Sequence, residues 1–186
     1  MESCLKIGWL ENAIHLPSKN YDDRPLETVV DLVVLHSISL PPEKFGVKYV
    51  CDFFLNKLDY QAHPYFEGLM DLRVAPHIFI GREGNVFQFV DLNKRAWHAG
   101  KSEWNGRQNC NDFSVGIELE GSDNQPFEMA QYDSLLIILK KLFKDFSKLK
   151  SGSVVGHSDV APGRKTDPGP YFDWDLIRNF ENKISQ

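Results

Sequence analysis

The chain has 186 residues, of which 42% are hydrophobic and 25% are charged, and its formal net charge is −5. These proportions exclude a disordered, collagen-like or membrane-embedded protein, and the acidic balance argues against the dense basic surface that nucleic-acid binding requires. A chain of this length can bury a sizeable core, so we expect a single domain over residues 1–186.

The first predicted elements are a buried strand, a loop and a short helix. The run Val29–Leu35 is rich in β-branched residues and leads directly to His36, which predicts a central strand with this histidine at its tip. Two consecutive prolines in Ser39–Gly46 prevent a helix or a paired strand there. Apolar residues then recur at steps of three and four over Val47–Leu58, which predicts an amphipathic helix covering one face of the sheet.

A hairpin and a loop of unusual composition follow. The strand-like runs His77–Ile80 and Val86–Val90 flank a turn that contains glycine, as in a β-hairpin. The segment Ala96–Cys110 is rich in glycine, asparagine and charge, yet it also carries two tryptophans and a histidine. Aromatic side chains on a loop often line a ligand site, so we expect this loop to border one.

The segment Ser114–Glu120 alternates as a strand with one apolar face. Its valine, isoleucine and leucine share that face, whereas Glu118 and Glu120 point to the other side. A carboxylate on the second face either borders a pocket or lies in solvent.

The last third of the chain completes the predicted fold. An apolar stripe predicts a helix over Phe127–Phe146, and Ser153–Gly156 predicts a short strand that enters His157. Residues 159–170 hold too much proline and glycine for regular structure, and Asp173 is a suitable N-cap for a final helix that buries its apolar side chains. Strands separated by amphipathic helices, with one hairpin, predict an α/β fold in which helices flank a central mixed sheet.

Two histidines at predicted strand ends and one aspartate could form a metal site. His36 and His157 each follow an apolar strand, and Asp167 lies ten positions after His157 in a proline-restricted loop. A catalytic zinc site uses three such ligands and leaves a fourth position for water. Each residue also has an ordinary alternative, because a histidine can cap a strand and an aspartate can start a turn. Other histidines could belong to a different trio: His63, His77 and His98.

Hydrolysis at such a site needs a base and a cation. Zinc lowers the pKa of bound water and polarises a carbonyl, so a carboxylate and a positive side chain complete the chemistry. Glu118 is the natural base, with Glu120 as its direct competitor, and Lys165 lies two residues before Asp167. The alternative is that Glu118 and Lys165 are simply solvated. A positive pocket for a small anion is also possible if Lys165 clusters with Arg73 and Arg107.

Several features predict a cytoplasmic protein. Charged and polar residues interrupt the apolar stretches of residues 1–16, unlike the centre of a secretory signal, and no window approaches the roughly 18 apolar residues of a membrane span. Cys4, Cys51 and Cys110 are odd in number and far apart, which favours reduced thiols over disulfides. We therefore expect a cytoplasmic monomer that binds neither nucleic acid nor membrane.

Six blocks of the sequence resemble the N-acetylmuramoyl-L-alanine amidase family, in particular its anhydromuramyl-peptide amidases of cell-wall recycling. They keep their order and spacing from about Gly8 to the last helix. The blocks are VVLHSISLPPEKFG, AHPYF, LRVAPHIFIGREGNVFQFV, KRAWHAG, CNDFSVGIELEG and GHSDVAPGRKTDPGP. The resemblance implies a zinc amidase whose fold is shared with peptidoglycan-recognition proteins.

The same resemblance assigns roles to individual residues. It places zinc on His36, His157 and Asp167, selects Glu118 over Glu120 as the base, and adds Lys165 as the catalytic cation. It implies cleavage of the amide between 1,6-anhydro-N-acetylmuramic acid and L-alanine of the stem peptide, so a small muropeptide is the expected substrate. The residues predicted to bind this substrate are Ser37, Arg73, His77, Trp97, His98, Ala99 and Arg107.

The chain departs from the family pattern at two positions. Ser37 stands where such enzymes often have asparagine, which affects contacts to the sugar, and Asn109 stands where arginine would anchor a peptide carboxylate.

Two other functions compete with the amidase of cell-wall recycling. One alternative is a muropeptide-binding module without catalysis, as in recognition proteins that lack the zinc ligands. The other is a phage-type amidase that acts on intact peptidoglycan.

Overall fold

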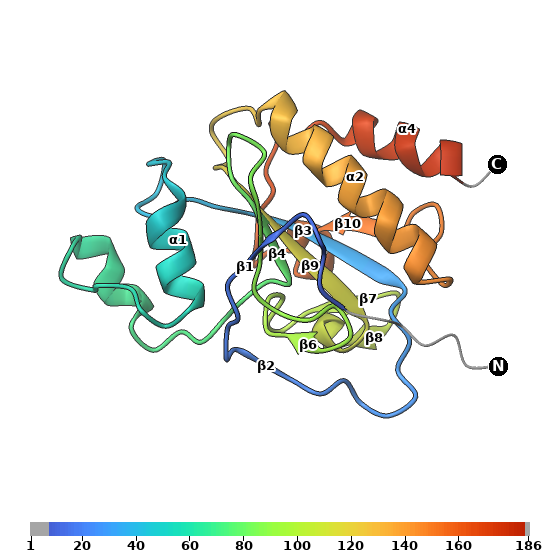
Figure 1. Cartoon of the computed structure of the whole chain (residues 1–186), viewed down its shortest axis with the longest axis horizontal. Coiled ribbons are helices and arrows are strands. Elements are labelled where there is room, and N and C mark those ends of the chain that lie inside the picture. The colour runs from blue at the N-terminus through green and yellow to red at the C-terminus, as the bar shows by residue number, and fades with distance from the viewer. Residues whose placement is uncertain (1–7, 185–186) are drawn as a thin grey trace.

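A mixed sheet of six strands forms the centre of the computed structural model, which describes residues 8–184. The strand order is β1-β5-β4-β9-β3-β10, and neighbours run parallel except for the antiparallel pair β4 and β5 (Figure 1). The strands are Ile14–His15 (β1), Leu32–Ile38 (β3), Ile78–Ile80 (β4), Val86–Gln88 (β5), Ser114–Glu120 (β9) and Val154–Gly156 (β10). The predicted mixed sheet and hairpin are confirmed.

Strand β3 differs from the prediction in its bounds. It begins at Leu32 rather than Val29 and continues to Ile38, because β9 pairs with all seven of its residues. His36 therefore lies within the strand and not at its tip, which corrects the expectation. Long-range pairing with β9 decided these bounds, and the local run of β-branched residues did not reveal it.

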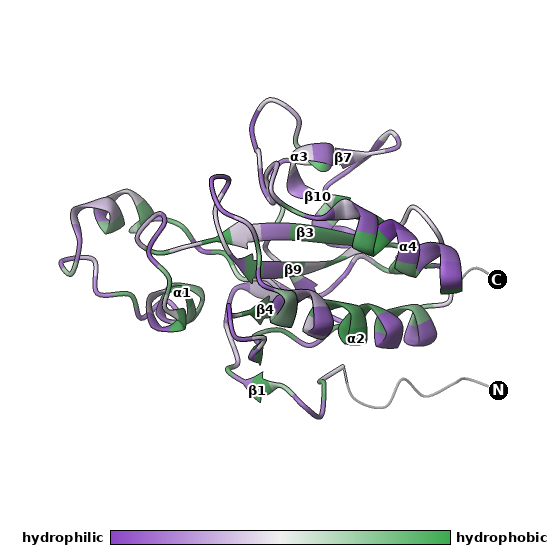
Figure 2. Cartoon of the chain, turned by 90° about the horizontal axis from the view of Figure 1, so that it is seen from above, coloured by the Kyte–Doolittle hydropathy of each residue, from purple (hydrophilic) through white to green (hydrophobic). Residues whose placement is uncertain are grey.

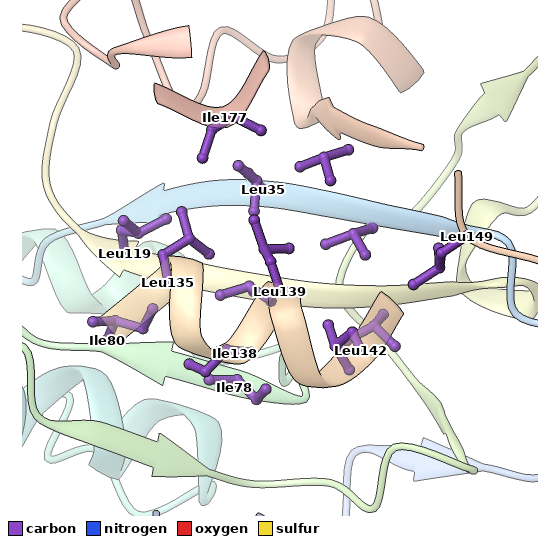
Figure 3. Close-up of a cluster of buried hydrophobic side chains, with 14 of the residues drawn as sticks. Leu35, Ile78, Ile80, Leu119, Leu135, Ile138, Leu139, Leu142, Leu149 and Ile177 are labelled. Atoms are coloured by element: carbon purple, nitrogen blue, oxygen red, sulfur yellow. The ribbon is translucent and has the colours of Figure 1, made fainter. Parts of the chain in front are cut away.

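Helices α2 (Met129–Asp145) and α4 (Trp174–Ile184) cover one face of the sheet (Figure 1). Figure 2 shows alternating hydrophobic and hydrophilic stretches along α2, as expected for a surface helix with one buried side. Figure 3 shows apolar residues of α2 and Ile177 of α4 packed around the sheet. The labelled core residues are Leu35, Ile78, Ile80, Leu119, Leu135, Ile138, Leu139, Leu142, Leu149 and Ile177.

The predicted N-cap of the final helix is confirmed, but not all of its apolar side chains are buried as predicted. The side chain of Asp173 accepts hydrogen bonds from the backbone of Asp175 and Leu176, as an N-cap does. Ile177 is fully buried, whereas Ile184 is 40% exposed because it lies at the end of the helix.

Helix α1 (Val47–Phe54) packs on the opposite side of the sheet and is shorter than predicted. Its Phe54 meets Phe79 of β4, and Phe79 alternates with the residues that face α2. The helix ends four residues before Leu58, because Asn56 adopts a left-handed backbone conformation with φ of 57°.

Short elements occupy the predicted loops. They are β2 (Tyr21–Asp22) paired with β6 (Arg95–Ala96), β7 (Glu103–Trp104) paired with β8 (Arg107–Gln108), the 3₁₀ turns η1 (Pro64–Leu69) and η2 (Cys110–Asp112), and helix α3 (His157–Val160). None of the helices in residues 8–184 combines the length and apolar character needed to cross a membrane. Cys51 and Cys110 are buried free thiols, and Cys4 lies outside the described residues.

Parallel pairing brings three of the predicted site residues to the same level of the sheet. His36 in β3 is the register partner of Glu118 in β9, and Gly156 at the end of β10 pairs with Leu35. His157 follows immediately and starts α3. Since apolar neighbours on β3 and β9 face α2 and α4, the side chains of His36 and Glu118 emerge on the other face.

Candidate metal centre and active site

Three side chains that are distant in the sequence converge on the sheet face opposite α2 and α4. The Nδ1 atoms of His36 and His157 are 2.9 Å apart. Oδ2 of Asp167 lies 3.0 Å from Nδ1 of His157 and 3.3 Å from Nδ1 of His36. Adjacent strands deliver the two histidines, and the loop after α3 returns the aspartate to them.

This set of donor atoms fits a zinc ion. Bonds of about 2.0–2.1 Å in a tetrahedral site would separate the ligand atoms by roughly 3.3 Å, close to the distances found here. Nε2 of His157 lies 3.1 Å from the carbonyl oxygen of Ala99. Because a carbonyl only accepts, the tautomer with hydrogen on Nε2 satisfies this contact, and in that tautomer Nδ1 is bare and can bind a metal. Two imidazoles and one carboxylate also leave a fourth position open for water.

The electrostatics of the cluster give these groups the protonation states that metal ligands need. Burial lowers the pKa of His36 to about 4, although the protonated ring could donate a hydrogen bond to Asp167, which opposes this decrease. Burial alone would raise the pKa of Asp167, but the hydrogen bonds that His157 and His36 donate whenever their Nδ1 atoms carry hydrogen outweigh it and hold that pKa below its usual range. At neutral pH the imidazole of His36 is therefore neutral and the carboxylate is ionised.

Glu118 lies beside the cluster with an unsatisfied carboxylate oxygen. Its Oε2 atom is buried and has no hydrogen-bond partner among the described residues. Burial raises its pKa well above the ordinary value, the charge of Asp167 adds to the rise, and Lys165 opposes it. A buried carboxyl group with a raised pKa beside the cluster is suited to accept and return a proton.

The competing glutamate has a different environment. Both carboxylate oxygens of Glu120 are engaged, one by the backbone N–H of Gly46 and the other by that of Arg82 at 3.1 Å. Glu120 thus ties two loops to the end of β9 and has no free oxygen directed to the metal cluster. The geometry favours Glu118 as the reactive carboxylate.

A cleft of about 650 Å³ opens over these residues. Seven of the predicted site residues line it: Ser37, His98, Ala99, Glu118, His157, Lys165 and Asp167. Its other wall is largely apolar and comes from α1, η1 and the segment after η1, including Phe53, Phe54, Tyr65, Leu69, Leu72 and Val74. The cleft therefore joins a polar reacting end to an apolar wall.

Four predicted substrate-binding residues do not line this cleft: Arg73, His77, Trp97 and Arg107. Arg107 pairs with Asp31 at 2.9 Å, and its guanidinium lies 3.9 Å from the ring centre of Phe113. Arg73 is exposed and donates to backbone carbonyls of its own segment. Ion pairing and local hydrogen bonds hold both arginines away from the cleft that Lys165 lines, so the possible cluster of Arg73, Arg107 and Lys165 does not form there.

His77 has a structural environment rather than a binding one. Its Nδ1 atom accepts from the backbone N–H of Gly116 at 3.0 Å, and Nε2 lies 3.0 Å from the carbonyl oxygen of Lys94. A second nearby group is the buried guanidinium of Arg24, 3.2 Å from the same Nε2. The side chain is fully buried, and its hydrogen bond to Gly116 stabilises β9.

Arg164 lines the cleft and was not among the predicted residues. Its Nη2 atom donates to the carbonyl oxygens of Ala99 and Lys101, both at 2.7 Å. It thereby ties the loop that carries His98 to the loop that carries Asp167. In the sequence, Arg164 is marked only by its position next to Lys165. That position does not distinguish an arginine that connects two loops from one that is exposed to solvent.

Comparisons with known proteins agree with this geometry. The profile of a family described as N-acetylmuramoyl-L-alanine amidase matches residues 26–170, a range that includes the metal cluster, Glu118 and Lys165. The chain is 49% identical over 171 residues to the 1,6-anhydro-N-acetylmuramyl-L-alanine amidase AmpD of Haemophilus influenzae. That alignment covers 92% of this chain and 93% of the relative.

Solved structures show the same fold. A crystal structure of a selenomethionine derivative of AmpD superposes with a TM-score of 0.90 at 46% identity and covers 93% of this chain and 96% of that one. The Escherichia coli amidase AmiD, in complex with anhydro-N-acetylmuramic acid-L-Ala-D-gamma-Glu-L-Lys, gives 0.61 at 26% identity, covering 88% and 66%. Drosophila peptidoglycan recognition protein SD gives 0.58 at 19% identity, covering 88% and 87%, so the predicted kinship of fold is confirmed.

Proposed function

Because the chain belongs to the N-acetylmuramoyl-L-alanine amidase family, we propose that it cleaves the amide between 1,6-anhydro-N-acetylmuramic acid and L-alanine of the stem peptide, as a zinc enzyme of peptidoglycan recycling. The observation that carries the chemistry is the convergence of His36, His157 and Asp167 beside the unpartnered Oε2 of Glu118. The named activity of the 49% identical relative supports the substrate.

His36, His157 and Asp167 would hold the zinc ion, which when bound supplies Lewis-acid polarisation of the scissile carbonyl and lowers the pKa of water. Glu118 accepts the proton of the attacking water and returns it to the nitrogen of the departing alanine. Lys165, on the cleft wall, stabilises negative charge that develops on the carbonyl oxygen. The products are the anhydro-sugar and the free peptide.

The cleft has room and chemistry for a small muropeptide. Its volume of about 650 Å³ lies in the range of small-molecule sites. AmiD, a related amidase, has been solved with an anhydromuropeptide in complex. We propose that the sugar and peptide of the substrate lie along the apolar wall while the amide lies over the metal centre. Ser37, which replaces the asparagine often found in such enzymes, lies on the wall of this cleft.

The cytoplasmic location and the monomeric state stay predictions. The pattern of cysteines supports the first, since Cys51 and Cys110 are free and buried in the structure. A sedimentation or scattering measurement of the mass in solution would settle the second.

One experiment separates the proposed enzyme from its two competitors. Metal content is measured by atomic absorption, and cleavage of anhydromuropeptide is compared with cleavage of polymeric peptidoglycan by the same preparation. We expect about one zinc per chain and faster turnover of the small substrate. His36→Ala should lose both metal and turnover, whereas His15→Ala, on the exposed edge strand β1, should keep both.

Other outcomes would contradict the proposal in distinct ways. A metal-free, inactive protein that still binds muropeptide would be a recognition module. Faster action on the polymer would indicate a phage-type amidase. Full turnover after His36→Ala would remove this residue from the metal site.

A further inference from the structure

A chain of hydrogen bonds extends behind His36, away from the metal position. Nε2 of His36 lies 2.9 Å from Nδ1 of His98. Nε2 of His98 lies 3.2 Å from Oγ of Ser114, and this hydroxyl lies 2.5 Å from the carbonyl oxygen of Cys110. The three side chains are buried, with exposures of 8% or less.

The far end of this chain fixes the direction of every hydrogen bond in it. A carbonyl oxygen only accepts, so Ser114 donates its single hydrogen to Cys110. The hydroxyl of Ser114 can then only accept from His98, whose Nε2 must carry the ring hydrogen. Neutral His98 is left with a bare Nδ1, which accepts from Nε2 of His36. His36 therefore keeps Nδ1 bare, and this is the atom that faces His157 and Asp167.

The position of His98 is held by its surroundings as well. Its ring lies against Gly116, where a β-carbon would come within 2.3 Å of Cγ of the histidine. Its backbone N–H and that of Ala99 both donate to Oδ1 of Asn111, at 3.2 and 2.8 Å. The ring of His36 meets it edge-on, with an interplanar angle of 87°. The glycine of the strand thus makes room for the partner of the first metal ligand.

We infer that His98 and Ser114 are positioning residues that hold His36 in the tautomer with hydrogen on Nε2, so that Nδ1 is presented to the metal. Without them, the Asp167 carboxylate, 3.3 Å from Nδ1 of His36, would attract a hydrogen onto the ligand atom itself. The inference rests on the proposed metal site. His98 lines the cleft, and the inference gives it a second role, which is to orient the ring of His36.

The test compares two buried serines of neighbouring segments. Ser114→Ala removes the acceptor for Nε2 of His98. Ser102→Ala removes a hydroxyl that donates to the carbonyl of Gly100 and accepts from the backbone N–H of Cys110, and among residues 8–184 it has no hydrogen bond to Ser114, His98 or His36. Zinc affinity is measured by competition with a chelator, and urea unfolding of the metal-free proteins reports any general loss of structure. Ser114→Thr, which restores the hydroxyl, is the conservative variant.

We expect Ser114→Ala to weaken zinc binding by about 10-fold, the lower end of the range typical for losing the direct partner of a metal-bound histidine, because Ser114 acts through His98. Ser102→Ala should change it less than about 3-fold, and Ser114→Thr should recover most of the affinity. Nitrogen-15 NMR of the metal-free protein should show His36 protonated on Nε2 in the wild type and a shift toward Nδ1 in Ser114→Ala.

The failures of this inference and of the proposed function are distinguishable. If the wild type binds zinc and Ser114→Ala binds it equally well, the positioning role is wrong while the metal site stands. An equal loss in Ser102→Ala, or His36 protonated on Nδ1 in the wild type, would also overturn it. A wild type that binds no zinc would instead contradict the proposed function.

Discussion

At the scale of single residues, the two glutamates of β9 show how environment assigns a role. Both point away from the apolar core, and they are two positions apart. Glu120 accepts from two backbone N–H groups and holds loops in place, whereas Oε2 of Glu118 is buried without a partner. An unsatisfied buried carboxylate is costly for the fold, and it is available for proton transfer.

Glu118→Gln should therefore keep the metal and lose catalysis. We expect turnover to fall by about 10²–10⁴-fold, the usual contribution of a general base, with zinc content unchanged. Single-turnover cleavage and atomic absorption on one preparation measure both quantities. Glu120→Gln is the control. It should lower the free energy of unfolding but leave turnover largely unchanged. A near-normal rate for Glu118→Gln would assign the base to another group.

At the scale of elements, one amide connects α2 to the ends of the two interior strands β4 and β9. The buried side chain of Gln131 donates to the carbonyl oxygens of Ile80 and Glu120, at 3.3 and 3.0 Å. Its oxygen accepts from the backbone N–H of Glu128 at the start of the helix. One residue of α2 thus joins β4 and β9, next to the strand position of Glu118.

Gln131→Leu should destabilise the protein although it adds an apolar side chain of similar size. Two buried carbonyls lose their donor and the helix start loses its acceptor, so we expect a loss of about 1–3 kcal/mol in the free energy of unfolding. Urea unfolding measures it. Lys140→Ala, at an exposed position of the same helix, should stay within about 0.5 kcal/mol. Equal effects of the two changes would show that the amide contributes nothing.

At the scale of the whole molecule, buried neutral histidines couple folding to pH. Burial, followed by the charge of Arg24, lowers the pKa of His77 to about 3, against the opposing bond to the carbonyl of Lys94. An unfolded histidine has a pKa near 6.5. The unfolded chain therefore binds a proton that the folded protein excludes, and stability decreases as the pH falls below about 6.5 and continues to decrease toward about 3.

Between pH 6.5 and 5, His77 should remove about 2 kcal/mol from the free energy of unfolding of the metal-free protein, since each pKa unit corresponds to about 1.36 kcal/mol. Urea titrations at several pH values measure the slope. His77→Asn should be less stable at pH 7 but lose less stability on acidification, whereas His63→Asn, at an exposed position, serves as the control. Equal slopes for wild type and His77→Asn would contradict the assignment.

Local patterns predicted most of the elements and fewer of the side-chain partners. The periodicity of α2 and the alternation of β9 appear in the structure within two residues of the expected bounds, because each depends on near neighbours in the chain. The extent of β3 depends on pairing with β9, about eighty positions away, and was misjudged at both ends. Arg107 was expected near a ligand but pairs with Asp31, a partner that local spacing does not reveal.

By itself the sequence determined the α/β class and the acidic net charge of the chain. Through blocks that resemble the amidase family, it also gave the residues proposed for metal binding and catalysis. The tertiary structure decided which atoms meet. His36 and His157 are 121 positions apart, and His36 and His98 are 62 apart, yet each pair lies at 2.9 Å. The periodicity of a sequence reflects contacts between residues that are near one another in the chain. The direction of a hydrogen bond in this site depends instead on partners that are distant in the chain. For that reason Ser114, a plain strand residue in the sequence, is recognised only in the fold as the hydrogen-bond partner of His98, which contacts the proposed metal ligand His36.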